Sequence, residues 1–380
     1  MLPKILTLWL CILLIHNGYT QENADRKIDA LILPKPTGKY QVGRYWTSFK
    51  DSARQQREIS VFLYYPVKGD QVVDYIIPTK QWRDAYLPVL QKKLGDSAGK
   101  AIAYAKAVFA NQTAILRKGK FPLVLFSPGM GWSALEYSFI IHELVSAGYI
   151  VATINTASIS PVLQIPEGKF LSEQSPADRY QQAASDMVYV LEQLKKSGDP
   201  LRRITAHIDF TRIAASGHSL GGAAAVLAAH TAREIKTAVN MDGDLLDGSS
   251  KATPKTSVLF LNQLPVGFEN LSFDDMKKDT TKGWRYQQMS KATTEAASGT
   301  YISVAGMYHS NFQDYALLPY TLIPENIRKW RLGPIDGSKC LLLIKQILIT
   351  HFNEVLKDKK GDWQKLEEEH SSIRIIRIKQ

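Results

Sequence analysis

One short segment of the chain combines residue types that could make a serine hydroxyl reactive. Residues 217–221 read Gly-His-Ser-Leu-Gly, between the apolar run 213–215 and an alanine-rich helical pattern. A Gly-x-Ser-x-Gly pentapeptide between a strand and a helix is typical of the turn that exposes a nucleophilic serine. A plain glycine-rich turn is the alternative. The setting favours Ser219 as a nucleophile, and Gly217 and Gly221 are expected to be required because side chains there would collide with neighbouring backbone.

A serine nucleophile needs a general base close to its hydroxyl. In folds with this turn the base lies downstream of the serine, on a loop at the carboxyl end of a strand. His309 meets this condition because it follows the predicted strand 301–305. The other histidines in question lie in helical patterns, in a charged tail or beside the serine, and are interpreted as non-catalytic: His142, His218, His351 and His370.

The base in turn needs a carboxylate that orients it. The predicted strand 236–241 ends at Asp242, far enough after Ser219 for one helix and one strand to intervene. The next predicted strand, 256–261, ends without a carboxylate, which favours Asp242. Asp244 is the main rival, and a plain turn around the intervening glycine is the alternative without chemistry.

Two backbone N–H groups are expected to bind the oxyanion of an attacked ester. The N–H of Leu220 follows the nucleophile directly, at the start of the alanine-rich helix. The loop 127–131, Ser-Pro-Gly-Met-Gly, follows an apolar strand and is expected to supply the second donor from Met130.

The elements around these residues alternate between strand and helix. Continuous apolar runs such as 121–126 predict parallel strands that are covered on both faces. The remaining predicted strands are 57–66 and 149–154, and the segment 373–379 is either an edge strand or a loose end. Helices are expected near 134–147, 176–194, 285–297 and 338–356, and the alanine-rich pattern directly after the serine pentapeptide predicts another. The sequence thus predicts an α/β fold with a mostly parallel central sheet and helices on both faces.

One catalytic domain is expected over residues 21–380, because no repeat or low-complexity linker divides the chain. Residues 21–55 are interpreted as an extended lead-in to this domain. A helical insertion over about 80–117 contains two helical patterns, 82–94 and 101–110. This insertion could cover the site or serve only in packing.

The first 20 residues are typical of a signal peptide. Lys4 precedes an apolar stretch, 5–15, that is too short to span a membrane. We therefore expect a secreted or periplasmic protein that begins near Gln21, with an uncleaved membrane anchor as the alternative. The two cysteines are Cys11 and Cys340. Removal of the leader leaves Cys340 without an intrachain partner, and it is interpreted as a core thiol.

Composition limits the classes of partner. The formal net charge is +11, but the lysines and arginines are spread along the chain without interleaved aromatic residues. This distribution argues against nucleic-acid binding. Metal-ligand clusters and phosphate-binding loops are not recognised in the sequence, so no cofactor is expected. Contact with a membrane surface stays open, as does the oligomeric state.

Together these motifs resemble the platelet-activating-factor acetylhydrolase (isoform II type) branch of the α/β-hydrolases, which overlaps the dienelactone-hydrolase-related esterases. The resemblance rests on the Ser219 pentapeptide, the position of Asp242, and the segment 306–314, Gly-Met-Tyr-His-Ser-Asn-Phe-Gln-Asp. It implies an α/β-hydrolase fold and cofactor-free cleavage of carboxylic esters. The family's triad then maps onto Ser219, Asp242 and His309, and its oxyanion donors onto Leu220 and Met130.

The expected function is a serine carboxylic-ester hydrolase that acts through an acyl-enzyme intermediate. Short-acyl, phospholipid-like and polyester substrates all remain open, because the chain departs from the family at Ser127–Pro128 and at Leu220. A non-catalytic binding protein on the same scaffold is one alternative. A thioesterase or peptidase that uses the same triad is another.

Overall fold

The computed structural model describes residues 30–111, 114–172, 174, 176–246, 256–294 and 296–379. The expected signal peptide, residues 1–20, lies outside the described residues.

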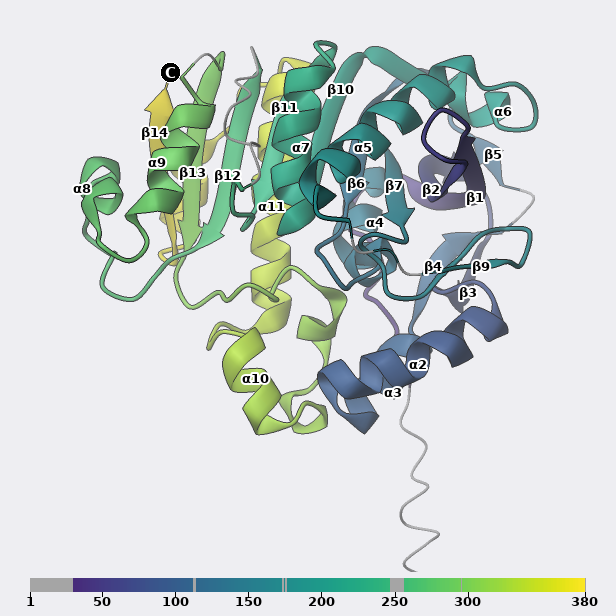
Figure 1. The fold of residues 1–380 in the computed structure, drawn as a ribbon, viewed down its shortest axis with the longest axis horizontal. Coiled ribbons are helices and arrows are strands. Elements are labelled where there is room, and N and C mark those ends of the chain that lie inside the picture. The colour runs from purple at the N-terminus through teal and green to yellow at the C-terminus, as the bar shows by residue number, and fades with distance from the viewer. Residues whose placement is uncertain are drawn as a thin grey trace, which may run out of the picture.

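A ten-stranded sheet forms the centre of the molecule (Figure 1). Its strands along the main path run in the order β1 (Gln41–Asp51), β2 (Arg57–Lys68), β7 (Ile150–Thr156), β6 (Phe121–Ser127), β10 (Ile208–His218), β11 (Ile235–Met241), β12 (Ser257–Gln263), β13 (Ser298–Val304) and β14 (Ile373–Lys379). The strands from β7 to β13 are parallel, whereas β1, β2 and β14 are antiparallel to their neighbours. The short strand β5 (Ile115–Leu116) pairs with β2.

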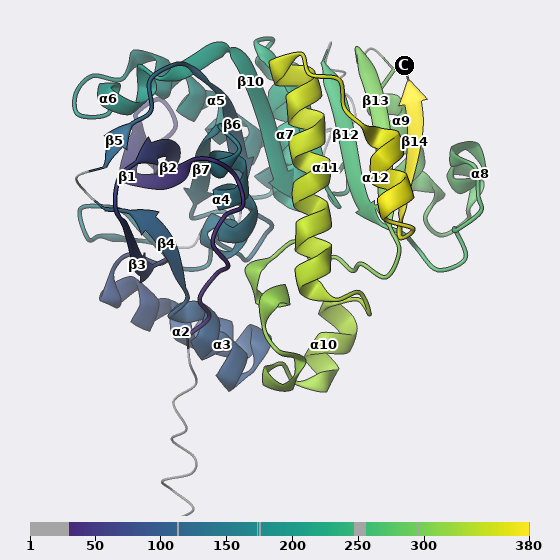
Figure 2. The same cartoon turned by 180° about the vertical axis from the view of Figure 1, so that it is seen from behind.

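Helices cover both faces of this sheet. Figure 1 shows α5 (Arg179–Lys196) and α7 (Leu220–Thr231) on one face, with α8 (Phe273–Lys278) and α9 (Gly283–Ala292) toward β13. Figure 2 shows α11 (Gly337–Lys357) and α12 (Trp363–Glu369) on the other face, where α4 (Ser138–Ser146) also packs. The short helix α6 (Arg202–Thr205) leads into β10. A separate hydrophobic core lies on each face of the sheet.

The central strands β6 and β7 are buried along their whole length. Every residue of β6 and of β7 is buried, as a parallel strand between two helical layers requires. On α7, alanines 223–225 are fully buried, and their small side chains let the helix lie close to the sheet. This packing places the amino end of α7 directly at the carboxyl end of β10.

The helical insertion and a second helical segment lie at the carboxyl ends of the parallel strands. The insertion contains α2 (Lys80–Leu94) and α3 (Asp96–Ala103), between the paired strands β3 (Gln71–Tyr75) and β4 (Lys106–Ala110). The second segment contains α10 (Glu325–Arg331), preceded by the 3-10 turns η2 (Asp314–Leu317) and η3 (Tyr320–Leu322). In Figure 1 both lie below the arrowheads of β7 and β12. The small hairpin of β8 (Leu163–Gln164) and β9 (Phe170–Leu171) follows β7.

Most of the predicted elements are confirmed, and of the two readings left open for residues 373–379 the structure shows the edge strand. Several expectations about the type or bounds of an element are wrong. Residues 41–51, read as lead-in, form β1, and the next strand continues through Pro66 to Lys68. The predicted helix 101–110 is instead the end of α3 followed by β4. The alternating burial of β4 shows the physical reason, because every second residue packs inward as in a half-buried strand.

The helix near 176–194 also begins later than predicted. Its cap is Asp178, so Pro176 precedes the helix rather than occupying its first position. Within the part of the chain that the structure describes, none of the helices combines the length and apolar character needed to cross a membrane.

Candidate active site

Ser219 occupies a sharp, left-handed turn between β10 and α7. Its backbone has φ 54° and ψ −123°, a conformation that L residues rarely adopt, and its N–H donates to the carbonyl oxygen of Met241 at 2.8 Å. A side-chain carbon at Gly217 would lie 2.3 Å from the carbonyl oxygen of Gly221, and one at Gly221 would lie 2.2 Å from that of Ser127. The expectation that both positions require glycine is confirmed, and the strain is of the kind that active sites retain.

The loop after β6 lies against the serine. A side-chain carbon at Gly129 would be 3.3 Å from Cβ of Ser219. The N–H groups on either side of Met130 are engaged, that of Gly129 with the hydroxyl of Tyr137 (3.3 Å) and that of Gly131 with a backbone carbonyl (2.8 Å). Among the hydrogen bonds of the described residues, none takes the N–H of Met130 or of Leu220.

Asp242 begins the turn that follows β11. It also has a left-handed backbone, with φ 53°, and its N–H donates to the carbonyl oxygen of Leu261 at 2.9 Å. The side chain of Asn240 closes the turn by hydrogen bonds to both backbone groups of Gly243, at 2.7 and 3.0 Å. A side-chain carbon at Gly243 would lie 2.2 Å from the carbonyl oxygen of Ser219. The turn that begins at Asp242 thus packs directly on the backbone of Ser219.

His309 lies on the loop that follows β13, and two buried side chains hold this loop. The side-chain oxygen of Asn311 accepts from the N–H groups of Tyr308 (2.8 Å) and Gly333 (2.9 Å). The carboxylate of Asp314 accepts from the first two N–H groups of α4, at 2.8 and 3.0 Å. Burial raises the pKa of Asp314 to about 7 despite these two hydrogen bonds. The loop that carries His309 is therefore attached to the amino end of α4.

A hydrogen bond joins the predicted base to the predicted acid. Nδ1 of His309 lies 2.7 Å from Oδ2 of Asp242, whose side chain is 1% exposed while that of His309 is 45% exposed. Burial alone would raise the pKa of Asp242, but the hydrogen bond to His309 and the charge of Arg285 hold that pKa below its ordinary value. An ionised acceptor at Nδ1 selects the tautomer in which Nε2 can accept a proton.

One contact expected between the predicted nucleophile and base is not observed. The hydrogen bonds of the described residues do not include one between the Ser219 hydroxyl and His309. Hydrogen bonds between nucleophile and base are often looser before substrate binds. His218, the residue next to Ser219, has its ring centroid 4.5 Å from that of His309. His142 and His351, read as non-catalytic, are buried on the α11 side of the sheet.

Two contacts of the site have no signal in the sequence. Arg285, in the first turn of α9, pairs with both Asp242 and Asp244, so the rival acid binds an arginine rather than the base. His218 donates from Nε2 to the carbonyl oxygen of His309 at 2.8 Å and meets the hydroxyl of Tyr137 at Nδ1, also at 2.8 Å. Burial and the neighbouring His309 lower the pKa of His218 well below its ordinary value, so His218 is neutral.

The helical insertion contacts the loop of residues 127–131, called here the oxyanion loop because it carries the predicted donor Met130. Nζ of Lys93, near the end of α2, binds the carbonyl oxygen of Gly131 and lies 4.3 Å from the ring centroid of Trp132. The ring of Trp132 stacks on that of Tyr315, which follows the base loop, at 5.6 Å. The insertion therefore borders the site through the loop that carries Met130.

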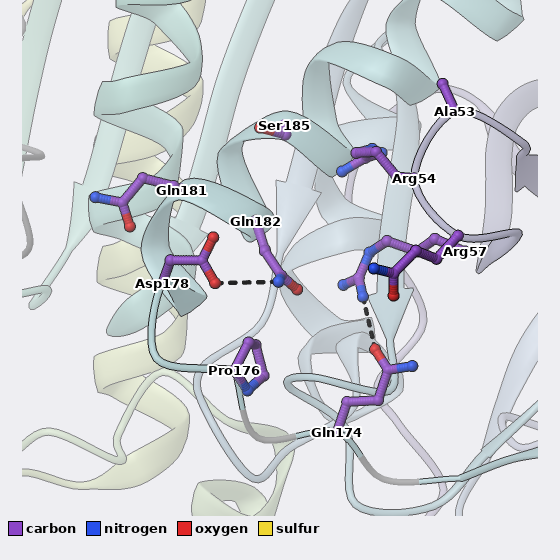
Figure 3. Close-up of a pocket in the computed structure, with 10 residues that line it drawn as sticks. Ala53, Arg54, Arg57, Gln174, Pro176, Asp178, Gln181, Gln182 and Ser185 are labelled. Atoms are coloured by element: carbon purple, nitrogen blue, oxygen red, sulfur yellow. Dashed lines mark hydrogen bonds between the residues drawn. The ribbon is translucent and has the colours of Figure 1, made fainter.

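A polar pocket of about 780 Å³ lies beside the carboxyl end of β7, between the β1–β2 turn and the first turns of α5 (Figure 3). Its arginines are already paired, because Arg54 and Arg57 both contact the buried Asp186, at 2.8 and 2.7 Å. Arg179, at the start of α5, lies 2.8 Å from Sδ of Met130. The pocket thus neighbours the oxyanion loop. Its lining is mostly amide and charged: Ala53, Arg54, Gln55, Arg57, Gln174, Pro176, Asp178, Gln181, Gln182 and Ser185.

Comparison with known proteins adds family evidence to this geometry. The family model described as platelet-activating factor acetylhydrolase, isoform II, matches residues 27–175 and 184–373, and a PET hydrolase-like model matches residues 112–243. A platelet-activating factor acetylhydrolase of Canis lupus familiaris is 26% identical over 74% of this chain and 68% of its own length. That of Cavia porcellus is 24% identical over 88% of this chain and 81% of its own.

A third relative and a solved structure are also similar. A probable 1-alkyl-2-acetylglycerophosphocholine esterase of Arthroderma benhamiae is 25% identical over 57% of this chain and 60% of its own length. The fold is similar to that of a ferulic acid esterase from Streptomyces cinnamoneus, with a TM-score of 0.72, 20% identity, and coverage of 91% of this chain and 99% of that one. The chain therefore belongs to the platelet-activating factor acetylhydrolase, isoform II, family, and it is an esterase-type hydrolase with an α/β-hydrolase fold.

Proposed function

We propose that the chain is a serine carboxylic-ester hydrolase whose triad is Ser219, His309 and Asp242. The hydrogen bond of 2.7 Å between His309 and Asp242 carries the proposal, because it joins two residues from separate loops beside a strained serine turn. A buried, ionised carboxylate at Nδ1 is the arrangement that lets an imidazole act as a general base at Nε2.

In this mechanism the hydroxyl oxygen of Ser219 attacks the ester carbonyl while Nε2 of His309 takes the hydroxyl proton. The N–H groups of Leu220 and Met130 bind the oxyanion of the tetrahedral intermediate. The imidazolium then gives its proton to the leaving alcohol, and an acyl-serine forms. In the second half, His309 takes a proton from water while the water oxygen attacks the acyl carbon. The imidazolium then returns the proton to the oxygen of Ser219 as its bond to the acyl carbon breaks and the acid is released.

The substrate class is proposed from the relatives. Two curated relatives are named as platelet-activating factor acetylhydrolases and a third as a probable alkylacetylglycerophosphocholine esterase, which favours a short acyl group. A polyester is the second candidate, because the PET hydrolase-like model covers the serine and acid segments. A panel of p-nitrophenyl esters of rising acyl length, with an acetylated phospholipid and a soluble polyester fragment, separates these classes.

Fluorophosphonate labelling tests the assignment of the nucleophile. The folded protein is expected to be labelled, and Ser219→Ala to abolish both labelling and ester hydrolysis while the melting temperature stays within a few degrees. A folded protein that takes no label and cleaves none of the esters would instead be a binding protein on this scaffold. A preference for thioester or amide analogues over the matched ester would show the alternative hydrolase classes.

We also propose that residues 1–20 direct secretion and that residues 21–380 form one catalytic domain that includes the insertion. N-terminal sequencing of the protein recovered from outside the cytoplasm is expected to begin near Gln21. A start at Met1 in a membrane fraction would support an uncleaved anchor. Limited proteolysis that separates two stable halves would contradict a single domain.

A further inference from the structure

Arg285 binds the second carboxylate oxygen of Asp242, the proposed triad acid. Its Nη2 lies 3.2 Å from Oδ1 of Asp242, whose other oxygen binds His309 at 2.7 Å. Its Nε pairs with Asp244, so one guanidinium spans both carboxylates of the turn. The side chains of Arg285 and Asp242 are 14% and 1% exposed, so solvent screens their interaction weakly.

The guanidinium has two consequences for the base. It fixes the plane of the Asp242 carboxylate, because both oxygens are held by donors from different elements, β13's loop and α9. It also opposes part of the negative charge that stabilises a protonated imidazole. A positive charge within several ångströms in a partly buried site changes a proton affinity by on the order of one pH unit.

The groups that face the His309 imidazole define its electrostatic environment. Asp242 contacts it directly, with Arg285 and Asp244 beyond. On the other side lies His218, which is neutral and already bound to Tyr137 and to the carbonyl oxygen of His309. Asp242 thus contacts the base directly, Arg285 contacts Asp242, and Asp244 offsets part of the positive charge of Arg285.

We propose that Arg285 is a positioning residue that locks the carboxylate of Asp242 and whose charge moves the acid limb of the triad's activity to lower pH. The proposal rests on the assignment of Ser219, His309 and Asp242 as the triad. It extends that assignment, because it identifies a residue on α9 that sets the pH range in which the base works. Asp244 opposes Arg285 by neutralising part of its charge.

Two substitutions that are expected to shift the pH profile in opposite directions test this role. In Arg285→Gln, the acid limb of the kcat/KM profile for p-nitrophenyl acetate is expected to move up by on the order of one pH unit. Its kcat on the plateau is expected to fall by about tenfold, because the carboxylate is no longer held. In Asp244→Asn, the acid limb is expected to move to lower pH, because Arg285 loses the carboxylate that offsets its charge. Arg285→Lys keeps the charge and is expected to keep the limb near its wild-type position.

A matched control is Arg233→Gln, an exposed arginine between α7 and β11 at the amino ends of the parallel strands, which is expected to change neither the acid limb nor kcat. An acid limb that stays in place in Arg285→Gln, or that moves in the same direction in Asp244→Asn, would overturn the proposal. If Arg285→Gln does not fold, the acid limbs of Arg285→Lys and Asp244→Asn test the proposal. A limb at the wild-type position in the first and at lower pH in the second would support it.

NMR titration of the His309 ring in Ser219→Ala, with and without Arg285→Gln, measures the same shift without catalysis. It therefore separates failure of this proposal from failure of the esterase assignment. An upward shift in a protein that hydrolyses no ester would sustain the role of Arg285 toward His309 and reject the enzyme mechanism. An unchanged titration would reject the role of Arg285.

Discussion

The Nε2 atom of His218 lies 2.8 Å from the backbone carbonyl oxygen of His309, so the residue before the proposed nucleophile holds the loop of the proposed base. At its other nitrogen, His218 accepts from the hydroxyl of Tyr137, whose oxygen accepts from the N–H of Gly129. A carbonyl acceptor at Nε2 requires the proton on that nitrogen, which leaves Nδ1 as an acceptor. One chain of hydrogen bonds therefore connects the oxyanion loop, the serine turn and the base loop.

Tyr137→Phe interrupts this chain at its centre. It leaves Nδ1 of His218 and the N–H of Gly129 without partners, so we expect the free energy of unfolding to fall by about 2–4 kcal/mol. We expect kcat to fall about tenfold with little change in KM, since the base and oxyanion loops lose their common support. Denaturant unfolding and steady-state kinetics measure the two effects.

Tyr149→Phe is the matched control for this change. Tyr149 is also fully buried, and its hydroxyl donates to Asn353 at 2.9 Å, away from the site. It is expected to lose stability while kcat per folded molecule stays at the wild-type value. Equal kcat losses in both variants would show that Tyr137 acts only through global stability.

Asp242→Asn removes the charge that orients His309 while it keeps the shape of the side chain. An amide can present its NH2 group to Nδ1, which favours the wrong tautomer, so we expect kcat to fall by on the order of 10³–10⁴-fold. Asp274→Asn, on the exposed first turn of α8, is the control for loss of one surface carboxylate. Ester hydrolysis within tenfold of wild type in Asp242→Asn would remove Asp242 from the triad and return Asp244 to consideration.

Gly221→Ala tests the packing of the serine turn on the oxyanion loop. The added carbon would lie 2.2 Å from the carbonyl oxygen of Ser127, so the loop or the helix must move. We expect a loss of on the order of 3 kcal/mol in the free energy of unfolding and a large loss of kcat. Gly198→Ala, where an added carbon meets nothing within 4 Å, is expected to change neither.

The pKa of Asp314, which burial raises to about 7, predicts a pH dependence of stability. Because the folded state binds this proton more tightly than the unfolded state, where the pKa is about 3.9, the contribution is favourable at low pH. It is lost as pH rises from about 4 through 7, by at most on the order of 4 kcal/mol. Urea unfolding from pH 4 to 8 measures this slope.

Asp314→Asn isolates the contribution of this carboxyl group, because an amide does not titrate in that range. The variant is expected to show a shallower fall in unfolding free energy between pH 4 and 7 than the wild type. Its absolute stability also changes, since the amide places an NH2 group where one of the two oxygens accepts from Ser138 or Phe139. An identical slope in the two proteins would show that Asp314 does not titrate in this window.

Local patterns in the sequence were sufficient for the central strands of the sheet and for the residues that follow their carboxyl ends. The apolar runs that became β6, β7 and β11 are buried on both faces, so each is recognisable without knowledge of its neighbours. Strands at the edge carry no such signal. In β1 only three residues are fully buried, and β3 has none, so both resemble loops in composition.

The amino-acid sequence by itself predicted the strand–turn–helix at Ser219 and the positions of Asp242, His309 and the loop 127–131 after the ends of their strands. These features depend on residues close together along the chain and on the rule that parallel strands end at one edge. Only the tertiary structure decided which groups share a hydrogen bond: His218 with His309, Asp314 with α4, and Arg285 with Asp242. Each of these contacts joins side chains or backbone from distant segments, and their distances depend on how helices pack on the sheet rather than on any local pattern.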